Sequence, residues 1–188
     1  GLTHLKLRLD KTPIADSEAF NSDIETIEHL INDMLLYARS EQPRESLDLI
    51  ELNDFVCEVV YALPYEVRTT ISDAQFQIAA DRVSLKRALN NLLDNAHRYA
   101  NDTSVTSYID QTGFTIEVAD NGPGISAGDL EKVFNPFFRI ESSRNREIGV
   151  SGLGLGTARA LLDANGDTLN LSNRDNGGLS AKIFFARD

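Results

Sequence analysis

The sequence predicts an α+β fold, a two-layer α/β sandwich preceded by a helical hairpin that is half of a four-helix bundle. Three observations predict this fold. Apolar residues recur at alternating spacings of four and three between Phe20 and Ala38, as in a coiled-coil seam. After Pro43 the pattern changes to short strands interleaved with longer helices, and an Asn-Gly-Gly turn at 176–178 joins the last two strands. With 188 residues, the chain has room for one main domain and a smaller appended element.

The helical hairpin is predicted to occupy residues 1–42. Its second helix covers residues 17–40, because a serine can cap the start of that helix and a proline follows its end. The first helix, over residues 2–11, is open to a second interpretation, because its leucines also alternate as in a strand. The change of pattern within residues 41–50 indicates a domain boundary, so residues 43–188 are predicted to form the second domain.

The second domain contains the elements of the sandwich. Two helices are predicted at 53–63 and 82–101, and a third follows a glycine-rich stretch and ends at Gly166. The predicted strands cover residues 75–79, 104–110, 114–119, 167–172 and 179–185. Gly113 is expected to separate the central pair of strands. Helices grouped against a largely antiparallel sheet give the predicted two layers.

Composition and charge exclude several classes of protein. Lys plus Arg number 18 against 29 for Asp plus Glu, and the resulting net charge of -11 argues against a nucleic-acid partner. No apolar run approaches the ~18 residues of a membrane span and no signal-peptide pattern opens the chain, which predicts a cytoplasmic fragment. The single cysteine, Cys57, excludes an internal disulfide framework and is expected to be a buried thiol.

The predicted helix over 82–101 carries polar side chains that converge on one face. Asn91, Asn95 and Arg98 project together, while leucines and an alanine occupy the opposite face. An amide oxygen is a neutral hard ligand suited to Mg²⁺, and an arginine nearby can hold a phosphate tail. An ordinary amphipathic helix with a solvated polar face accounts for the same pattern, so this helix alone does not decide the function.

Two glycine-containing stretches follow this helix. The strand at 114–119 runs into Asp-Asn-Gly-Pro-Gly, which places Asp120 at a strand end and lets Gly122 and Gly124 turn and approach a ligand closely. Such an aspartate could accept a hydrogen bond from the amino group of an adenine, although a plain turn has the same composition. Glycines at 152, 154 and 156 then precede a helix, which suits either a phosphate site or a flexible loop.

In order and spacing, these three stretches resemble the N, G1 and G2 boxes of the GHKL ATPase superfamily. Between the last two lies Val-Phe-Asn-Pro-Phe-Phe-Arg-Ile, which resembles the F box of the sensor histidine kinases of two-component systems. The resemblance over residues 91–155 implies a Bergerat-type α/β sandwich that binds ATP and Mg²⁺ beneath a mobile lid at roughly residues 139–151. It favours a sensor kinase over the gyrase, mismatch-repair and heat-shock relatives.

The resemblance also implies roles for individual residues. Asn95 matches the principal Mg²⁺-coordinating asparagine, Asn91 is a second candidate, and Arg98 occupies the basic position that meets the phosphates. Asp120 matches the aspartate that hydrogen-bonds the adenine amino group. The other residues implied to contact the nucleotide are Tyr99, Gly122, Gly124, Ile125, Phe138, Arg139, Gly152, Leu153, Gly154 and Leu155.

The lid region departs from the family pattern at two positions. Val150 stands where many members have a glycine, and Gly156 replaces a common alanine. These changes are expected to alter the stiffness of the lid without abolishing binding. A local basic cluster of Arg139, Arg144 and Arg146 lies beside the same glycine-rich segment.

The helical hairpin resembles the dimerisation and phosphoacceptor domain of the same kinases, because Leu-Leu-Tyr-Ala-Arg at 35–39 matches the end of its second helix. Counting back from that segment places the phosphoacceptor histidine before Gly1, so the chain is expected to lack it. His4 and His29 are expected to be bundle or surface residues, and no role follows for His97. The resemblance implies a full-length parent that is a homodimer anchored in the inner membrane.

The leading hypothesis is a protein-histidine kinase that passes the γ-phosphoryl group of Mg·ATP to a bundle histidine and then to an aspartate of a response regulator. A fragment without the acceptor histidine would bind ATP but would not label itself. Two alternatives stay open, namely a nucleotide-binding module that docks a response regulator without transfer, and another GHKL ATPase of the DNA-topology or repair type.

Overall fold

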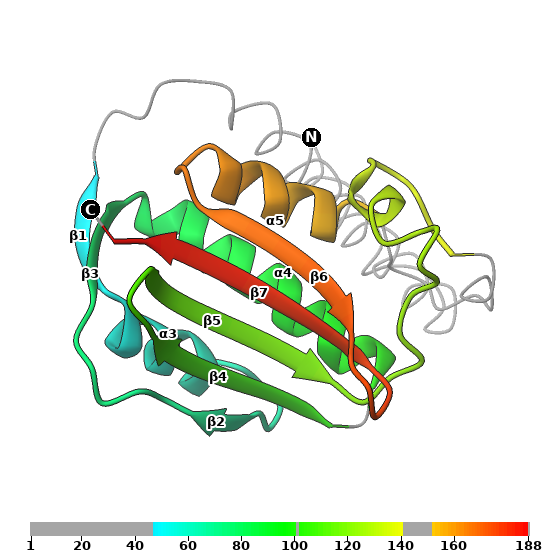
Figure 1. The fold of residues 1–188 in the computed structure, drawn as a ribbon, viewed down its shortest axis with the longest axis horizontal. Coiled ribbons are helices and arrows are strands. Elements are labelled where there is room, and N and C mark those ends of the chain that lie inside the picture. Colours follow the sequence, from blue (N-terminus) through cyan, green and yellow to red (C-terminus); the bar gives the residue numbers. More distant parts are fainter. Residues whose placement is uncertain (1–46, 101, 141–151, 188) are drawn as a thin grey trace, which may run out of the picture.

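The computed structural model describes residues 47–100, 102–140 and 152–187, so the hairpin predicted at 1–42 lies outside the described residues. Within the described ranges the chain has an α+β fold (Figure 1), as predicted. The main sheet has five strands, in the order β2 (Arg68–Thr70), β4 (Thr103–Ile109), β5 (Gly113–Asp120), β7 (Leu179–Ala186) and β6 (Thr168–Asn173). β2 pairs with β4 in parallel, whereas the other three pairings are antiparallel.

Three helices lie on one face of this sheet in Figure 1, and they are α3 (Leu52–Tyr61), α4 (Arg82–Tyr99) and α5 (Gly154–Asp163). α4 begins at Arg82 because the Asp81 side chain accepts hydrogen bonds from the backbone N–H groups of Val83 and Ser84. Its buried apolar residues are Leu85, Ala88, Leu89, Leu92, Leu93 and Ala96, whereas Val83 in the first turn is exposed. The predicted division of α4 into an apolar and a polar side is therefore confirmed.

The hydrophobic core lies between the helices and the sheet. Its largest fully buried side chains include Phe55 of α3, Leu89 of α4, Phe114 of β5, and Ile183 and Phe185 of β7. Each such side chain contributes about 1.5–3 kcal/mol by its removal from water. Within the described residues, no helix combines the length and apolarity needed to cross a membrane.

The sequence did not predict β2 or β1 (Asp48–Glu51). The strand predicted at 75–79 is β3 (Gln77–Ala80), and it pairs with β1 in a separate two-stranded sheet. Glu51 joins this small sheet to α3, because its carboxylate accepts hydrogen bonds from the backbone N–H groups of Asp54, at 2.7 Å, and Phe76, at 3.2 Å. The capping of α3 therefore depends on the strand that precedes it.

Cys57 is exposed, so the prediction of a buried thiol is wrong. α3 buries Leu52, Phe55, Val56 and Val59, which lie along one side of the helix. At about 100° per residue, Cys57 lies roughly 150° around the helix from the centre of that side. Its exposure therefore follows from the helical period.

Gly113 is the first residue of β5, so it does not itself form the turn between the central strands. Residues 110–112 form that turn, and the Asp110 carboxylate accepts hydrogen bonds from the backbone N–H groups of Thr112, at 2.7 Å, and Gly113, at 3.2 Å. The hydroxyl and N–H of Thr112 lower the pKa of Asp110 below its ordinary value. A Cβ atom at Gly113 would overlap the carbonyl oxygen of Phe185 on β7, which explains the glycine.

Candidate nucleotide-binding site

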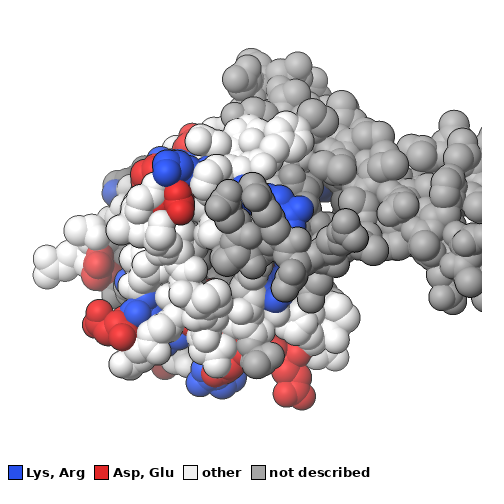
Figure 2. All heavy atoms as spheres, turned by 90° about the vertical axis from the view of Figure 1, so that its right-hand side faces the viewer, with Lys and Arg blue, Asp and Glu red and all other residues white. Residues whose placement is uncertain are grey.

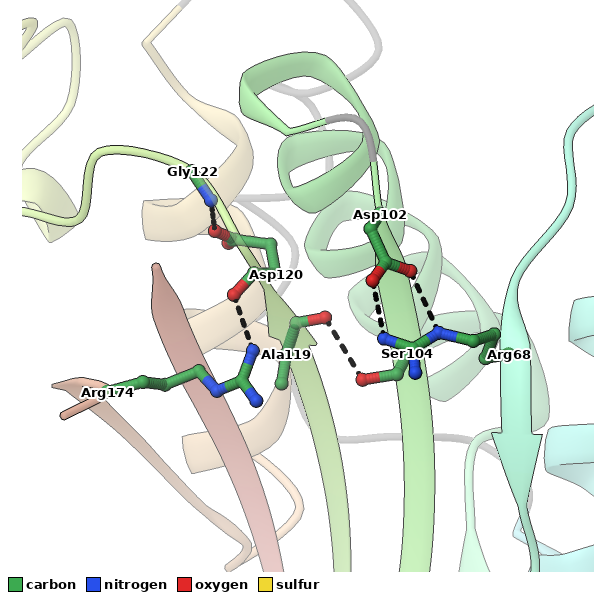
Figure 3. Close-up of polar contacts among 7 residues, drawn as sticks. All are labelled: Arg68, Asp102, Ser104, Ala119, Asp120, Gly122 and Arg174. Atoms are coloured by element: carbon green, nitrogen blue, oxygen red, sulfur yellow. Dashed lines mark hydrogen bonds and ion pairs between the residues drawn. The ribbon is translucent and has the colours of Figure 1, made fainter. Parts of the chain in front are cut away.

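Asp120 is a buried carboxylate at the end of β5, with 5% of its surface exposed. Its Oδ1 atom accepts hydrogen bonds from the backbone N–H groups of Gly122, at 2.8 Å, and Leu179, at 3.1 Å. Figure 3 shows the carboxylate turned toward Gly122 at the end of the strand. In the part of the chain that the structure describes, Oδ2 accepts no hydrogen bond. The geometry thus leaves one oxygen of a fixed carboxylate able to accept a ligand amino group.

The glycines after Asp120 meet a tight packing requirement. A Cβ atom at Gly122 would lie 2.7 Å from the carbonyl oxygen of Tyr99 and 3.0 Å from Oδ1 of Asp120. Gly124 has a φ of +71°, which disfavours residues with a side chain. The end of α4 occupies the space where a side chain at Gly122 would lie, and the approach of a ligand to these glycines stays a prediction. The loop after β5 therefore packs against the C-terminal end of α4, and together they form one wall of the candidate site.

The first turn of α5 faces Asn91 of α4. A Cβ atom built at Gly154 would lie 4.0 Å from Cγ of Asn91. Leu153, at the N-cap, makes no side-chain cap hydrogen bond to the first turn of α5, and a helix N-terminus of this kind suits an anion. Leu153 itself is buried and Leu155 packs against the core, which leaves only their backbone to meet a ligand.

Asn91 carries a buried polar group without a partner. Among the described residues, its Nδ2 atom has no hydrogen-bond partner. A buried amide N–H without a partner costs about 1–3 kcal/mol, so such groups are rare unless a ligand or water meets them. This unpaired group beside the start of α5 fits a ligand with oxygen acceptors, such as a phosphate chain.

The remaining predicted residues of α4 extend this wall. Asn95 is half-buried one turn after Asn91, and Arg98 and Tyr99 are exposed at the C-terminal end of the helix. Among the described residues, no group of three or more His, Cys, Asp or Glu could hold a metal ion. A Mg²⁺ ion here would therefore use amide oxygens, water and ligand phosphates, a set of ligands that Mg²⁺ accepts. The residues present fit a Mg²⁺ ion of that kind.

The F-box segment contains the short 3-10 helix η1 (Lys132–Phe134), which packs against α5. The guanidinium carbon of Arg159 lies 4.4 Å from the ring centroid of Phe134, and its Nη1 atom donates a hydrogen bond to Glu131 at 2.9 Å. A Cβ atom at Gly156 would lie 2.5 Å from the carbonyl oxygen of Phe134. Gly156 therefore allows the backbone of η1 to lie directly on α5.

The end of the F box lies beside the start of α5. Phe137 donates its backbone N–H to the carbonyl of Gly152 at 3.0 Å, and a Cβ atom at Gly152 would lie 3.1 Å from backbone atoms of Phe137 and Phe138. Phe138 is half-buried and Arg139 is exposed. The other residues of the predicted lid and basic cluster, Arg144, Arg146 and Val150, lie outside the described residues.

Sequence reasoning missed the contribution of the β6–β7 hairpin to the site. The Asn-Gly-Gly turn at 176–178 was predicted only as a connection between strands, and this connection is confirmed. β7 pairs with β5, so the hairpin lies beside Asp120 and supplies the N–H of Leu179. Short-range sequence patterns do not report a contact between residues so far apart in the chain.

Comparison with known proteins assigns a family to this arrangement. The family described as histidine kinase-, DNA gyrase B- and HSP90-like ATPase matches residues 80–188. The chain is 35% identical over 188 residues to the sensor protein RstB of Escherichia coli, covering 94% of this chain and 43% of RstB. It is 27% identical over 176 residues to the E. coli sensor histidine kinase CpxA, covering 89% of this chain and 38% of CpxA. The chain thus spans about two fifths of the length of these relatives.

Solved structures show the same fold. The histidine kinase AdeS of Acinetobacter baumannii superposes with a TM-score of 0.73 at 22% identity, covering 98% of this chain and 92% of that structure. Full-length ShkA, solved in complex with AMPPNP, has a TM-score of 0.71 at 19% identity and covers 99% of this chain and 45% of that structure. The family match covers more than half of the chain, so the chain belongs to the histidine kinase-, DNA gyrase B- and HSP90-like ATPases, as the ATP-binding catalytic domain of a two-component sensor histidine kinase. The resemblance seen in the four boxes is confirmed.

Proposed function

We propose that this domain, a Bergerat-type two-layer sandwich, binds Mg·ATP and transfers the γ-phosphoryl group to a histidine, from which it passes to an aspartate of a response regulator. The single observation that carries the proposal is Asp120, a buried carboxylate with one oxygen fixed by two backbone N–H groups and the other left to accept from an adenine amino group. This arrangement suits recognition of a base at a strand end.

The other groups of the site are proposed from their match to the family boxes and from their positions on α4 and at the start of α5. Asn95 and Asn91 would offer amide oxygens to Mg²⁺, and Arg98 would meet the phosphates. The N–H groups of residues 152–155, at the start of α5, would bind the phosphate chain. The remaining contacts of the nucleotide are proposed at Tyr99, Gly122, Gly124, Ile125, Phe138 and Arg139. Catalysis would then depend on positioning and charge neutralisation.

We assign residues 1–42 to a dimerisation and phosphoacceptor hairpin and residues 43–188 to the catalytic domain. The parent protein would be a membrane-anchored homodimer whose catalytic domain lies in the cytoplasm and whose partner is a response regulator. Nucleic acid is not proposed as a partner, because the net charge is -11. On the face shown in Figure 2, the described basic side chains lie in small separate patches among acidic and uncharged ones, which does not suit a phosphate backbone.

Calorimetry of Mg·ATP binding tests the site. Asn95→Ala and Asp120→Ala should each weaken binding by about tenfold or more, because each removes a charge-assisted or metal-mediated contact. Asn170→Ala and Asp175→Ala are matched controls, because both residues are exposed and lie outside the proposed site. Unchanged affinity in both site variants would refute the assignment.

Phosphoryl transfer requires its own test. The chain is incubated with γ-labelled ATP, with and without a separate phosphoacceptor hairpin that carries a histidine. Label should appear on the supplied hairpin and pass to a response regulator, and Asp120→Ala should abolish both. ATP binding without any labelled protein would contradict the kinase proposal, and steady ATP hydrolysis without a phosphoprotein would indicate an ATPase instead.

A further inference from the structure

The β6–β7 hairpin holds both ends of the loop that follows Asp120. At the first end, Arg174 donates a hydrogen bond from Nη1 to the backbone carbonyl of Asp120 at 2.7 Å. Figure 3 shows the Arg174 side chain reaching from the hairpin to that carbonyl, while Gly122 meets the carboxylate of the same residue. The N–H of Leu179 on β7 reaches the carboxylate as well, at 3.1 Å. Both the backbone and the side chain of Asp120 are therefore held by this hairpin.

At the other end of the loop, Asn173 pairs with the backbone of Ile125. Its Oδ1 atom accepts the N–H of Ile125 at 2.8 Å, and its Nδ2 atom donates to the carbonyl of the same residue at 2.6 Å. The same Oδ1 atom lies 2.7 Å from the position of a Cβ atom at Gly124. One amide side chain thus replaces the strand pairing that the loop lacks after it leaves β5.

The turn of the hairpin packs closely against the start of the loop. Gly178 has a φ of +94°, and a Cβ atom there would overlap the carbonyl oxygen of Asp120. The same Cβ atom at Gly178 would lie 2.9 Å from the Cα atom of Asn121. Because the hairpin and the loop are closely packed and joined by hydrogen bonds at both ends, a displacement of one displaces the other.

We propose that Asn173 and Arg174 are positioning residues that orient the base-binding loop, so that they set both the affinity for ATP and the preference for an adenine amino group. The inference rests on the proposed function, because it takes Asp120 as the residue that reads the base. Oδ1 of Asp120 is held by Gly122 and Leu179, and Arg174 fixes the carbonyl of the same residue. With these anchors in place, Oδ2 points to one fixed position, as a selective acceptor must.

Asn173 and Arg174 hydrogen-bond the loop backbone at Ile125 and Asp120, which lies at the base-reading end of the proposed site. Their loss should therefore weaken binding of the ground state and the transition state alike. The rate of transfer at saturating ATP should stay unchanged. This split between affinity and rate separates positioning of the base from a role in the transfer itself.

Calorimetry with Mg·ATP and Mg·ITP tests the inference, because ITP lacks the amino group of adenine. Asn173→Ala and Arg174→Ala should each weaken ATP binding about three- to tenfold, which is the usual effect of removing hydrogen bonds of this kind. ITP binding should fall less, so that the preference for ATP over ITP decreases. Arg174→Lys, which keeps one donor for the carbonyl, should recover part of the lost affinity.

Two exposed residues of the same hairpin serve as controls. Asn170→Ala and Asp175→Ala alter β6 and the turn without touching the loop, and both should bind ATP as the unaltered chain does. Thermal unfolding without nucleotide is measured for every variant. If the loss of ATP affinity comes with an equal loss of ITP affinity and a lower melting temperature, the role is merely structural and the inference is overturned.

Asp120→Ala separates failure of this inference from failure of the proposed function. Weak binding by Asp120→Ala together with unchanged binding by Asn173→Ala and Arg174→Ala overturns only the positioning role. Unchanged binding by Asp120→Ala removes the proposed base-reading site itself, and any effect at Asn173 or Arg174 would then act by another route. A reduced ATP preference in all three variants supports the inference.

Discussion

The phenol ring of Tyr65 stacks on the imidazole ring of His97, with ring centroids 3.8 Å apart and ring planes 1° from parallel. Tyr65 lies in the connection between α3 and β2, and His97 lies on α4. The Tyr65 hydroxyl also donates a hydrogen bond to Asp94 of α4 at 2.8 Å. The contact therefore fastens that connection to the helix that carries Asn91 and Asn95. It also gives a structural role to His97, for which the sequence suggested none.

Substitutions at Tyr65 should separate the hydrogen bond from the stacking. Tyr65→Phe keeps the ring and removes the hydroxyl, so the free energy of unfolding should fall by about 1 kcal/mol. Tyr65→Ala should lose a further ~0.5–1.5 kcal/mol through the lost stacking. Urea unfolding at pH 7 measures both, with Tyr61→Phe as the control, because Tyr61 is 94% exposed. If Tyr65→Phe and Tyr65→Ala lower the free energy of unfolding by the same amount, the stacking contributes nothing to stability.

The hydroxyl of Tyr65 should also make stability depend on alkaline pH. Burial, and then the hydrogen bond to Asp94 and its charge, raise the pKa of Tyr65 above its ordinary value. The folded state therefore favours the neutral phenol, and this stabilisation is complete below the unfolded pKa of ~10 and is lost as the pH rises further. The stability difference between the unaltered chain and Tyr65→Phe should shrink from pH 9 to pH 11. A constant difference over that range would contradict the assignment.

Two neighbouring glycines of the β6–β7 turn should respond differently to alanine. Both have positive φ, +88° at Gly177 and +94° at Gly178, so each substitution should cost about 1–2 kcal/mol through the backbone. A Cβ atom at Gly177 meets nothing within 4 Å, whereas one at Gly178 overlaps the carbonyl oxygen of Asp120. Gly178→Ala should therefore lose clearly more stability and also weaken ATP binding, as unfolding and calorimetry would show. Similar losses at both positions would mean that the hairpin can move away from Asp120.

Gly156→Ala should destabilise the domain, although alanine is the better helix former. In an open helix, glycine to alanine stabilises by about 1 kcal/mol. At Gly156 the new methyl group would lie 2.5 Å from the carbonyl oxygen of Phe134, so η1 must shift, at a net cost of roughly 1–3 kcal/mol. Gly128→Ala is the control, because nothing lies within 4 Å of its Cβ position. Urea unfolding measures both variants. If Gly156→Ala raises the free energy of unfolding, η1 can move away from the new methyl group at little cost.

Long elements with strong local signals could be predicted from the sequence. The helix predicted at 82–101 is α4, at Arg82–Tyr99, because the aspartate cap and the leucine spacing are both local. β2 was missed because it has three residues, all exposed, and exists only through its parallel pairing with β4. Pairing between segments so far apart leaves no periodic pattern in either one.

The candidate site likewise contains residues that a local sequence pattern predicts and residues that only the tertiary fold brings together. Asp120, Gly122 and Gly124 stand together in the sequence, so their position at a strand end could be predicted. Asn173 and Arg174 reach the same loop only because β7 pairs with β5 and carries the hairpin there. The exposure of Cys57 could have been predicted, because the helical period places it away from the buried side of α3.

The unpaired amide of Asn91 predicts a conflict between stability and binding. Its Nδ2 atom is buried and has no hydrogen-bond partner in the described part of the chain, and a buried donor in that state costs free energy in the nucleotide-free protein. Asn91→Leu, which has a similar volume, should raise the free energy of unfolding by about 1 kcal/mol in the absence of nucleotide. The same variant should bind Mg·ATP more weakly, because it loses an amide that is proposed to meet the ligand.

Asn95 is the matched comparison for this prediction, because it is half-buried on the same helix and has no such buried, unpaired atom. Asn95→Leu should therefore weaken Mg·ATP binding without raising stability. Urea unfolding measures the stability of both variants, and calorimetry measures their affinity for Mg·ATP. Both variants should bind more weakly, and only Asn91→Leu should be more stable. If Asn91→Leu is more stable and still binds Mg·ATP normally, the amide of Asn91 has no role toward the ligand. If Asn91→Leu is less stable, the amide is satisfied by water, and only the binding result bears on its role.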